Sequence, residues 1–274
     1  MPEMPEVEII KRSLQDRLVG RTIQQVDIML PRLIKWPTAD RFQAITTGKK
    51  ITSLTRRGKY LLFGLEDDLV IVVHLRMTGK LLYSSANTQQ DRFSRIKFYL
   101  DNGDMMQYAD SRTLGTLYAM SLDELWRITG LSSMGPEPLS EDFTLNYLKE
   151  GLKKHKGNIK ALLLNQRFIG GLGNIYVDES LAIAGIHPER KADSVTESEV
   201  DKLFSSINAV IRDGIEHGGT TFRDYRDGNG HSGSHQFHLR VYGRKLLPCL
   251  ICGTPIVKIE VAGRGTHYCP NCQR

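Results

Sequence analysis

The four cysteines of the chain lie in two pairs close to its C-terminus. Cys249 and Cys252 form one C-x2-C pair, sixteen residues follow, and Cys269 and Cys272 form the second pair. Two such pairs about 15–20 residues apart are typical of a structural zinc site, because each tight turn supplies two thiolates of one tetrahedron. Two disulfides are the alternative, but the regular spacing and a reducing compartment disfavour them. We therefore expect one zinc ion per chain, which shapes the fold and takes no part in catalysis.

A second candidate group is the start of the chain, Met1-Pro2-Glu3. Met-Pro favours removal of the initiator methionine, which would leave Pro2 with a free secondary amine. The pKa of such an amine is about 8, so much of it is unprotonated and nucleophilic at neutral pH. It can attack an aldehyde-like carbon and form an iminium, while the carboxyl group of Glu3 moves protons. Many proteins begin with Met-Pro, however, and a carboxylate at this position often caps a helix or is simply solvated.

The net charge of +6 is concentrated near the C-terminus. Between Gly218 and Arg274 there are eight Lys or Arg residues, three acidic residues and four of the eight histidines. Such a segment favours a polyanionic partner, most simply nucleic acid, although a solvated basic surface is the alternative. The chain contains no Walker loop, HExxH or G-x-S-x-G motif, which disfavours the chemistries that those motifs serve.

The overall composition is that of a globular protein. With 274 residues, of which 40% are hydrophobic and 25% are charged, the chain is long enough for about two domains. Its longest apolar runs, such as residues 69–75, have the length of a strand and are far too short to span a membrane. The first ten residues contain three glutamates and no basic residue, so no secretory signal peptide is expected. We expect a cytoplasmic protein that does not associate with membranes.

The elements that must position these groups change from strands to helices along the chain. Apolar residues at helical spacing predict an amphipathic helix over 5–18, ending at Gly20. Short β-type runs with turns between them then predict an antiparallel sandwich or barrel, over 51–65, 69–77, 95–100 and 105–110. Residues 121–130 are predicted to be helical, and the Gly-Pro-Glu-Pro segment 135–138 is predicted to be a stiff linker between domains.

Beyond this linker the pattern is mainly helical. Helices are predicted over 144–156, 159–168 and 174–185. The next helix is expected to open with a capping box at Thr196 and Glu199 and to stop at Gly218-Gly219. The polar, glycine-rich residues 220–236 predict a mobile loop, and residues 237–244 together with the cysteine-bearing end are expected to form strands around the zinc ion.

Four motifs resemble one family, and they occur in the family's order from end to end. They are MPEMPEVE at the N-terminus, RRGKY at 56–60, GNIYVDES at 173–180 and VAGRGTHYCPNCQ at 261–273. The family is formamidopyrimidine-DNA glycosylase, a bifunctional base-excision repair enzyme. The resemblance implies an α+β fold with an N-terminal antiparallel β-sandwich and flanking helices over 1–134. It further implies a helix-two-turn-helix DNA-binding domain over 135–226, and the end of a damaged-base loop with a four-cysteine zinc finger over 227–274.

The resemblance also implies catalytic roles. Pro2 matches the nucleophile that attacks C1′ of the damaged nucleotide, and Glu3 matches its acid/base partner. Lys59 resembles the lysine assigned to proton transfer during β-elimination, and Arg264 resembles the zinc-finger arginine that contacts a phosphate and is assigned to δ-elimination. A strand-edge lysine and a surface arginine at a hairpin tip are the structural alternatives. Glu6 matches a further carboxylate of the motif, although an acid in the first turn of a helix is nearly as good an explanation.

Asn174 follows Gly173 at the predicted start of a helix, where its side chain and free backbone N–H groups can hold a phosphate. The alternative for Asn174 is a simple N-cap. Three other residues of the same motif are expected to support the fold of that helix: Tyr176, Asp178 and Glu179.

A base inside a duplex is out of reach, so an enzyme of this kind must flip its target and fill the gap. The family fills the gap with a methionine, an arginine and a phenylalanine. Met77 and Arg112 match the first two, whereas Leu114 stands at the third position and is a departure. Without the resemblance, Met77 would be interpreted as a core methionine.

Three further positions expected to face DNA also depart from the family. Where the family often has a His-x-His pair, this chain has Phe93 and Arg95, and His155 stands where a lysine or arginine is usual in the basic run before Lys160. We expect these departures to alter affinity or lesion preference and to leave the chemistry intact.

These observations predict a DNA glycosylase and apurinic/apyrimidinic lyase that acts as a monomer on damaged double-stranded DNA. Its expected substrates are oxidised purines such as 8-oxoguanine and formamidopyrimidines. One alternative is an endonuclease-VIII-type glycosylase for oxidised pyrimidines, which the Met77 and Arg112 pattern disfavours. The other is a zinc-ribbon DNA-binding protein without catalysis, which the intact Pro2-Glu3 start disfavours.

Overall fold

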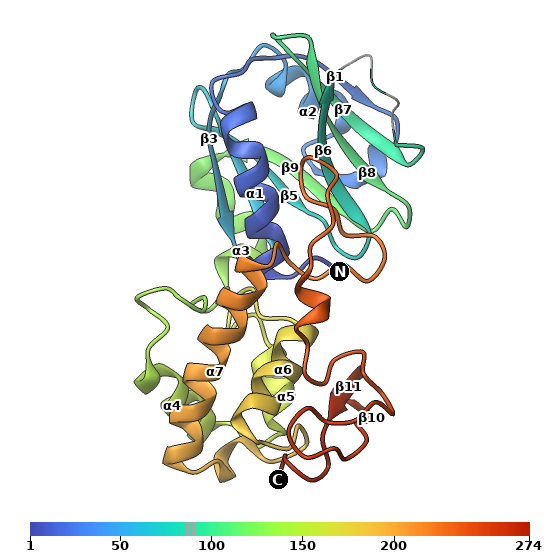
Figure 1. Cartoon of the computed structure of the whole chain (residues 1–274). Helices are drawn as coiled ribbons and strands as arrows, with labels where there is room; N and C mark the ends of the chain where they lie inside the picture. The colour runs from blue at the N-terminus through green and yellow to red at the C-terminus, as the bar shows by residue number, and fades with distance from the viewer. Residues whose placement is uncertain (86–87, 89–90) are drawn as a thin grey trace. The chain divides into compact units, whose positions relative to one another are not determined.

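The computed structural model describes residues 1–85, 88 and 91–274. By its internal contacts the chain divides into two compact units (Figure 1). Unit 1 comprises Met1–Ser132 and His217–Gln236, and unit 2 comprises Ser133–Glu216 and Phe237–Arg274. Residues 217–236 therefore belong with the N-terminal unit, although they follow the helices of unit 2 in the sequence.

Unit 1 is built on two sheets. One sheet has the strand order β1-β7-β8-β6, and the other has the order β2-β9-β5-β4-β3. Neighbouring strands are antiparallel except for β2 and β9, which run parallel. The strands are β1 (Ile23–Ile28), β2 (Ile34–Trp36), β3 (Ile51–Arg57), β4 (Tyr60–Leu65), β5 (Leu69–His74), β6 (Gly79–Ser85), β7 (Ser94–Leu100), β8 (Asp104–Asp110) and β9 (Thr116–Ser121).

The core of unit 1 lies between these sheets. Every second residue of β4 is buried, as the period of a half-buried strand requires, and Phe63 from this strand shares one hydrophobic cluster with Phe98 of β7. Ile10 of the N-terminal helix and Phe42 join the same cluster, and the rings of Phe42 and Phe98 lie 6.3 Å apart. Both sheets thus bury their inner faces against each other, which confirms the predicted β-sandwich.

The helices of unit 1 flank the sandwich. They are α1 (Met4–Leu18), η1 (Pro31–Leu33), α2 (Ala39–Thr46), η2 (Leu122–Arg127) and α3 (Thr129–Ser132). The helix α1 was expected from its apolar spacing and is confirmed. Residues 121–130 are largely helical, as predicted, but they form a 3-10 segment followed by the start of a one-turn α-helix instead of one regular helix. Residues 122–127 bury no side chain, so no packed face supports a regular α-helix there.

Unit 2 consists mainly of helices with a C-terminal hairpin. Its elements are α4 (Leu145–Lys154), α5 (Ile159–Leu164), α6 (Asn174–Ala184), η3 (Ala192–Ser194), α7 (Glu197–Glu216), β10 (Val257–Val261) and β11 (Arg264–Tyr268), and η4 (His235–Phe237) crosses from unit 1. The side chains of Thr144 and Asn158 cap α4 and α5 by accepting backbone N–H bonds. The helix α6 packs against α7, α5 and β11, so it lies at the centre of this unit.

The start of α7 only partly follows the predicted capping box. The Glu199 carboxylate accepts the Thr196 backbone N–H at 2.8 Å, but the Thr196 hydroxyl donates to the same carboxylate. Arg190 donates two further hydrogen bonds to Glu199, at 2.6 and 2.7 Å. The Arg190 guanidinium is the main reason that the pKa of Glu199 falls to about 2. Glu199 therefore joins α7 to the preceding loop as well as capping it.

The strand predicted over 237–244 is wrong. This segment pairs with no strand in the part of the chain that the structure describes, where the hairpin of unit 2 consists of β10 and β11. The backbone N–H groups of Arg240, Val241 and Tyr242 donate to the carboxylate of Glu179 at 2.7–2.9 Å. Because these donors are satisfied by a side chain, the segment does not need a β-ladder.

Among the described residues, none of the helices combines the length and the apolar character that crossing a membrane would require.

Candidate active site and metal centre

The N-terminus is held by a capping box at the start of α1. Glu3 is the N-cap residue, and its backbone N–H donates to the Glu6 carboxylate at 2.8 Å, while the Glu3 side chain accepts the backbone N–H of Glu6. Pro2, Glu3 and Glu6 are all buried, whereas Met1 is 48% exposed. The capping function that the sequence left as an alternative for Glu3 is thus real. It also fixes the position of the residue just before the cap, which is Pro2.

Glu6 connects this helix start to the segment 217–236. Its second carboxylate oxygen accepts the backbone N–H of Thr220 at 2.7 Å. The Tyr225 hydroxyl donates to the Gly218 carbonyl at 3.0 Å, and burial raises the pKa of Tyr225, with the nearby Glu6 and Asp227 adding to the effect. Both Thr220 and Tyr225 are buried. The segment therefore has an irregular backbone that is held by specific hydrogen bonds of Thr220 and Tyr225. Its expected mobility stays a prediction.

Lys59 lies in the turn between β3 and β4. Arg57 pairs with Tyr60, so the turn has two residues, and Gly58 occupies its first position with a φ of 56°. A left-handed residue there is typical of a type II′ turn, which glycine adopts without strain. The Lys59 side chain is only 7% exposed. It is therefore not a solvated lysine on a strand edge.

His74, at the end of β5, is a site residue that sequence reasoning missed. It pairs across the sheet with Tyr60, and the two rings meet edge to face with centroids 4.5 Å apart. Its Nδ1 accepts the backbone N–H of Arg76 at 3.1 Å. Burial, helped by the positive charges of Arg76 and Lys59, lowers the pKa of His74 to about 3. The ring is neutral at pH 7, and nothing in its sequence neighbourhood signals this.

Met77, Arg112 and Leu114 lie on two neighbouring turns that leave the sheets. Met77 and Leu114 are 43% and 48% exposed, so Met77 is not a core residue. Nη1 of Arg112 lies 3.4 Å from the sulfur of Met77. The structure thus brings together two of the three residues predicted to fill the DNA gap, and it places Leu114 two residues further along the same turn.

The carboxylate of Asp110 organises these two turns and was also missed. Asp110 is fully buried and accepts hydrogen bonds from the Thr78 hydroxyl and from the backbone N–H groups of Arg112 and Gly115, at 2.5, 3.1 and 2.9 Å. The Tyr108 hydroxyl donates to it at 3.1 Å. A lone aspartate at a strand end carries no sequence signal of this role, because its four donors come from different positions along the chain.

The positions of Phe93 and His155 do not by themselves indicate a contact with DNA. The ring of Phe93 is flanked by the guanidinium groups of Arg92 and Arg95, 4.5 and 5.8 Å from its centroid. His155 is the C-cap residue of α4, and its buried Nε2 has no hydrogen-bond partner among the described residues. A DNA contact by either residue stays a prediction.

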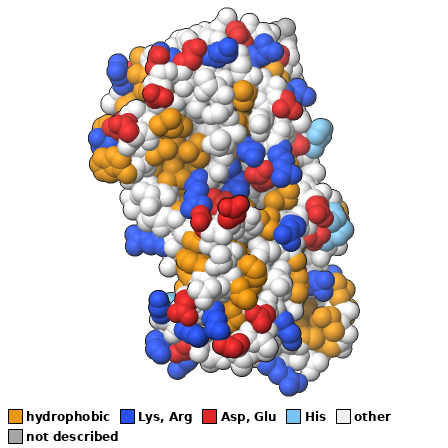
Figure 2. Space-filling model, turned by 90° about the vertical axis from the view of Figure 1, so that its left-hand side faces the viewer, with side chains coloured by type: hydrophobic (Ala, Val, Ile, Leu, Met, Phe, Trp, Pro, Cys, Tyr) orange, Lys and Arg blue, Asp and Glu red, His pale blue; other side chains and the backbone are white. Residues whose placement is uncertain are grey.

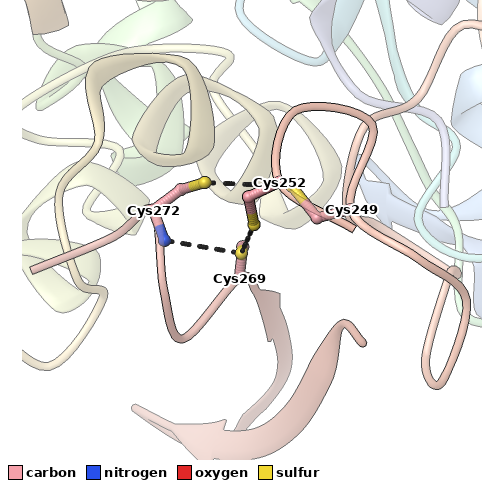
Figure 3. A group of neighbouring side chains, drawn as sticks. All are labelled: Cys249, Cys252, Cys269 and Cys272. Carbon is pink, nitrogen blue, oxygen red and sulfur yellow. Dashed lines mark hydrogen bonds between the residues drawn. The ribbon is translucent and has the colours of Figure 1, made fainter. Parts of the chain in front are cut away.

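The four cysteines converge on one point in unit 2 (Figure 3). All four sulfur atoms lie within 4.8 Å of one another, with Cys252 and Cys269 3.5 Å apart and Cys249 and Cys272 3.9 Å apart. None forms a disulfide. Tetrahedral zinc with Zn–S bonds of about 2.3 Å needs sulfur atoms about 3.8 Å apart, so this geometry fits. The four thiols hold one structural zinc ion, as predicted.

Arg264 stands at the tip of the hairpin beside this metal site. Val261 pairs with Arg264, and the two residues between them, Ala262 and Gly263, have φ values of 52° and 68°. Two left-handed residues make a type I′ turn, and Gly263 supplies one of them at no steric cost. The Arg264 side chain is exposed. Its place is therefore set by the backbone of β11 rather than by packing of its own side chain.

The helices α5 and α6 hold β11 by three hydrogen bonds. Asn174 donates to the Gly265 carbonyl at 2.9 Å, Lys160 donates to the Thr266 hydroxyl at 2.7 Å, and Asp178 accepts the His267 N–H at 2.8 Å. Lys160 and Asp178 also form an ion pair in which both side chains are fully buried. The N-cap of α6 is Gly173, so Asn174 does not cap its own helix. Asp178, like Tyr176 and Glu179, is buried and supports the fold, as expected.

The predicted residues thus fall into two groups. Unit 1 gathers Pro2, Glu3, Glu6 and Lys59 with the two turns that carry Met77 and Arg112, and unit 2 gathers Asn174, Arg264 and the four thiols. On the face drawn in Figure 2, acidic and basic side chains are interspersed, so the net charge of +6 does not form one uninterrupted basic surface there.

Three family models match successive parts of the chain. Residues 1–117 match the formamidopyrimidine-DNA glycosylase N-terminal domain, and residues 134–226 match the H2TH domain of the same enzyme. Residues 247–274 match a zinc finger found in FPG and IleRS. Together these matches cover most of the chain and follow the order of the motifs in the sequence.

Curated relatives and solved structures agree with these matches. The chain is 47% identical to a formamidopyrimidine-DNA glycosylase of Desulforamulus reducens and 44% identical to one of Enterococcus faecalis, over its whole length and 99% and 98% of theirs. It superposes with a TM-score of 0.94, at 38% identity over the full length of both chains, on Lactococcus lactis Fpg in a complex with DNA containing an abasic site. The chain belongs to the formamidopyrimidine-DNA glycosylase family.

Proposed function

We propose that this protein removes oxidised purines from double-stranded DNA and then cuts the strand at the resulting abasic site. The observation that carries the proposal is the buried start of α1, where a capping box holds Pro2 next to the carboxyl group of Glu3. The similar Lactococcus lactis protein has been solved with DNA containing an abasic site, and a mutant of it with DNA containing Fapy-dG. Both DNAs fit an enzyme that releases a base and acts again on the product.

Pro2 is the proposed nucleophile after Met1 is removed. Its lone pair forms a bond to C1′ while the bond from C1′ to the damaged base breaks. The base leaves with the bonding electrons and takes up the proton that the Pro2 nitrogen loses. Opening of the sugar ring then gives the iminium, and the carboxyl group of Glu3 supplies the proton that the ring oxygen needs. Because Glu6 holds the backbone N–H of Glu3, the proton donor stays beside the nucleophile.

Lys59 is the proposed base for the elimination that follows. When a proton is removed from C2′, the bond from C3′ to its oxygen breaks and the 3′ phosphate leaves. A second elimination then releases the 5′ phosphate, and this step is assigned to Arg264. His74, with its pKa lowered to about 3 chiefly by burial, adds no second positive charge beside Lys59. Since its Nδ1 accepts a hydrogen bond, the neutral ring carries its proton on Nε2, where it is a donor.

The other predicted residues are assigned to DNA binding. Asn174 and Arg264 lie on neighbouring backbone in unit 2 and are proposed to contact phosphates. Met77, Arg112 and Leu114 are proposed to fill the gap left by the flipped base, and Phe93 and His155 to face the duplex. The zinc ion supplies no chemistry to these steps and stabilises the turns that carry the β10–β11 hairpin.

We further propose that the protein acts as a monomer. It works in the cytoplasm, where it associates with the nucleoid through DNA, and it does not bind membranes. It works as three parts, residues 1–134, 135–226 and 227–274. Oxidised purines are the preferred substrates. The match to the formamidopyrimidine-DNA glycosylase N-terminal domain supports this over the endonuclease-VIII-type alternative, and it disfavours a zinc ribbon without catalysis.

The test is to trap the covalent intermediate. The protein is incubated with duplexes carrying 8-oxoguanine, an oxidised pyrimidine or an abasic site, in the presence of borohydride. We expect an adduct on the N-terminal peptide, with the oxidised-purine duplex reacting faster than the pyrimidine duplex. The matched control is a variant with an N-terminal extension, which should bind the duplex and form no adduct. An adduct that maps to Lys59 would contradict the assignment of Pro2.

A further inference from the structure

A polar bridge connects the helix that begins beside Pro2 with the turn that carries Lys59. Glu8 lies in the second turn of α1, and its Oε2 accepts a hydrogen bond from Nε of Arg56 on β3 at 3.0 Å. Nη1 of the same guanidinium donates to the carbonyl of Gly58 at 3.0 Å. One planar group thus binds α1 through one nitrogen and the Gly58-Lys59 turn through another.

The bridge is shielded from solvent. The side chains of Arg56 and Glu8 are 11% and 10% exposed, and α1 packs directly on β3 and β4 at this place. Burial by itself would raise the pKa of Glu8, but hydrogen bonds from Arg12, Lys11 and Arg56 outweigh it and lower the pKa. The carboxylate is therefore ionised at neutral pH, and its charge-assisted bond to Arg56 is stronger than a bond between neutral groups.

The other cations on Glu8 do not reach the turn. Arg12 and Lys11 contact Oε1 of Glu8 at 2.8 and 3.0 Å, and both lie on α1 itself. Arg12 is 58% exposed. Arg56 is thus the cation of this cluster that links two elements, while Arg12 provides a matched comparison with the same carboxylate partner and no link to Gly58.

From this arrangement we infer that Arg56, held by Glu8, is a positioning residue for the reaction. It fixes the Gly58-Lys59 turn relative to the start of α1, and so it sets where the Lys59 ammonium lies with respect to the Pro2 nitrogen. The inference rests on the proposed function, because it needs Pro2 and Lys59 to act on one nucleotide. Arginine suits the role because its rigid fork donates in two directions, whereas a lysine ammonium at the end of a flexible stem does not.

The experiment measures the rate of borohydride trapping on an abasic-site duplex, with enzyme in excess, for the full-length protein. For Arg56→Ala we expect the maximal rate to fall about 10- to 100-fold, since a misplacement of about 1 Å can have an effect of this size. The DNA concentration that gives half the maximal rate should stay within about twofold of wild type, because DNA-contacting side chains are untouched. Arg56→Lys should lie between the two, and Arg12→Ala should react like wild type.

Each result then decides between the alternatives. A merely stabilising Arg56 predicts a lower melting temperature and an unchanged maximal rate for protein that is folded, and that outcome would overturn the inference. Equal losses in Arg12→Ala and Arg56→Ala would also overturn it, because the helix cluster and not the link would be responsible. If Arg56→Ala does not fold, Arg56→Lys and Glu8→Gln decide, and wild-type rates in both would count against the bridge. A wild-type protein that forms no adduct on Pro2 would instead remove the proposed function, and the inference with it.

Discussion

The two units position their functional side chains by contacts of different range. Around Pro2 and Lys59 several of the fixing contacts are local, such as Glu3 with Glu6, three residues apart, and Arg56 with Gly58, two residues apart. Around Arg264 they come from groups 91, 106 and 89 residues away in the sequence, which bind Gly265, Thr266 and His267. Unit 1 also has long-range bonds, such as Arg56 with Glu8, 48 residues apart, and Thr220 with Glu6, 214 residues apart.

This difference has an energetic consequence. Local contacts close small loops, so they cost little chain entropy and form whenever the helix or hairpin forms. The hairpin of unit 2 has two short strands and must be fixed by a metal ion and by buried polar groups on α5 and α6. We therefore expect loss of the metal or of a buried charge to damage unit 2 selectively, while titration of His74 should act on unit 1.

Removal of zinc should have the largest effect. Because a structural zinc site contributes on the order of 10 kcal/mol to folding its own module, chelation or Cys269→Ser should unfold the hairpin and misplace Arg264. DNA affinity, measured by fluorescence anisotropy, should fall at least about 100-fold, which corresponds to about 3 kcal/mol. The β-type circular dichroism of unit 1 should persist. Pro270→Ala, in the same exposed turn, is the control, and full affinity without zinc would refute this view of unit 2.

Loss of the buried charge on Asp178 should come next. Asp178→Asn leaves the Lys160 ammonium in a fully buried site without its counter-charge. Breaking such a pair costs about 3–5 kcal/mol, so the helical circular-dichroism signal should be lost at a markedly lower denaturant concentration. The matched variant is Asp193→Asn, which breaks an ion pair whose Lys156 partner is 84% exposed and should change little. Similar midpoints for the two variants would mean that the buried pair does not anchor the hairpin.

The pH dependence of unit 1 should be smaller and should depend on His74. Its pKa is lowered to about 3, mainly by burial, whereas in the unfolded chain it returns to about 6.5. Between these values the unfolded state binds a proton that the folded state does not. Stability should therefore fall as pH decreases from 6.5 towards 3, by up to about 1.4 kcal/mol per pH unit from this group.

The variant His74→Asn retains a hydrogen-bond acceptor for Arg76 and should make this slope less steep. His231, whose side chain is 78% exposed in the same unit, provides the control variant His231→Asn. The measurement is urea unfolding across the pH range, followed by tryptophan fluorescence. An unchanged slope in His74→Asn would show that the ring is not held neutral.

Substitution of Arg112 should change specificity rather than stability. A guanidinium has only donors, so in the gap it should favour cytosine, which offers acceptors, over adenine. Arg112→Ala should weaken binding by about 1–3 kcal/mol and flatten the preference for a lesion opposite cytosine. The readout is the excision rate on duplexes that differ only in the opposite base. A preference that survives the substitution would place Arg112 outside the gap.

The smallest effect is expected for Leu114→Phe. Leucine cannot stack on a base, whereas an aromatic ring contributes on the order of 1–3 kcal/mol when stacking is complete. Since Leu114 is half exposed on a turn, we expect only part of this gain, and affinity for lesion-containing duplex should rise about two- to fivefold. Leu114→Met serves as the control of similar size. Weaker binding by Leu114→Phe would indicate that the turn has no room for a wedge.

The sequence by itself determined the features that depend on spacing. The two C-x2-C pairs specified the metal site, because each turn must bring two ligands within a few ångströms of one ion. The apolar period of α1 and the alternation in β4 specified the sandwich and its flanking helix, since a repeat along the chain defines one buried face. Four ordered motifs were enough for the family, and the comparisons confirmed it.

Only the tertiary structure decided which polar groups hold the functional residues. The carboxylate of Asp110 collects donors from two turns, and that of Glu179 satisfies the backbone of 240–242, so the predicted strand does not form. The pKa of His74 depends on burial and on Arg76 and Lys59. Each of these effects needs at least one partner that is distant in sequence, such as Thr78, 32 residues from Asp110, or Glu179, 62 residues from Val241. Such contacts leave neither a period nor a fixed spacing, which is why the sequence alone could not specify them.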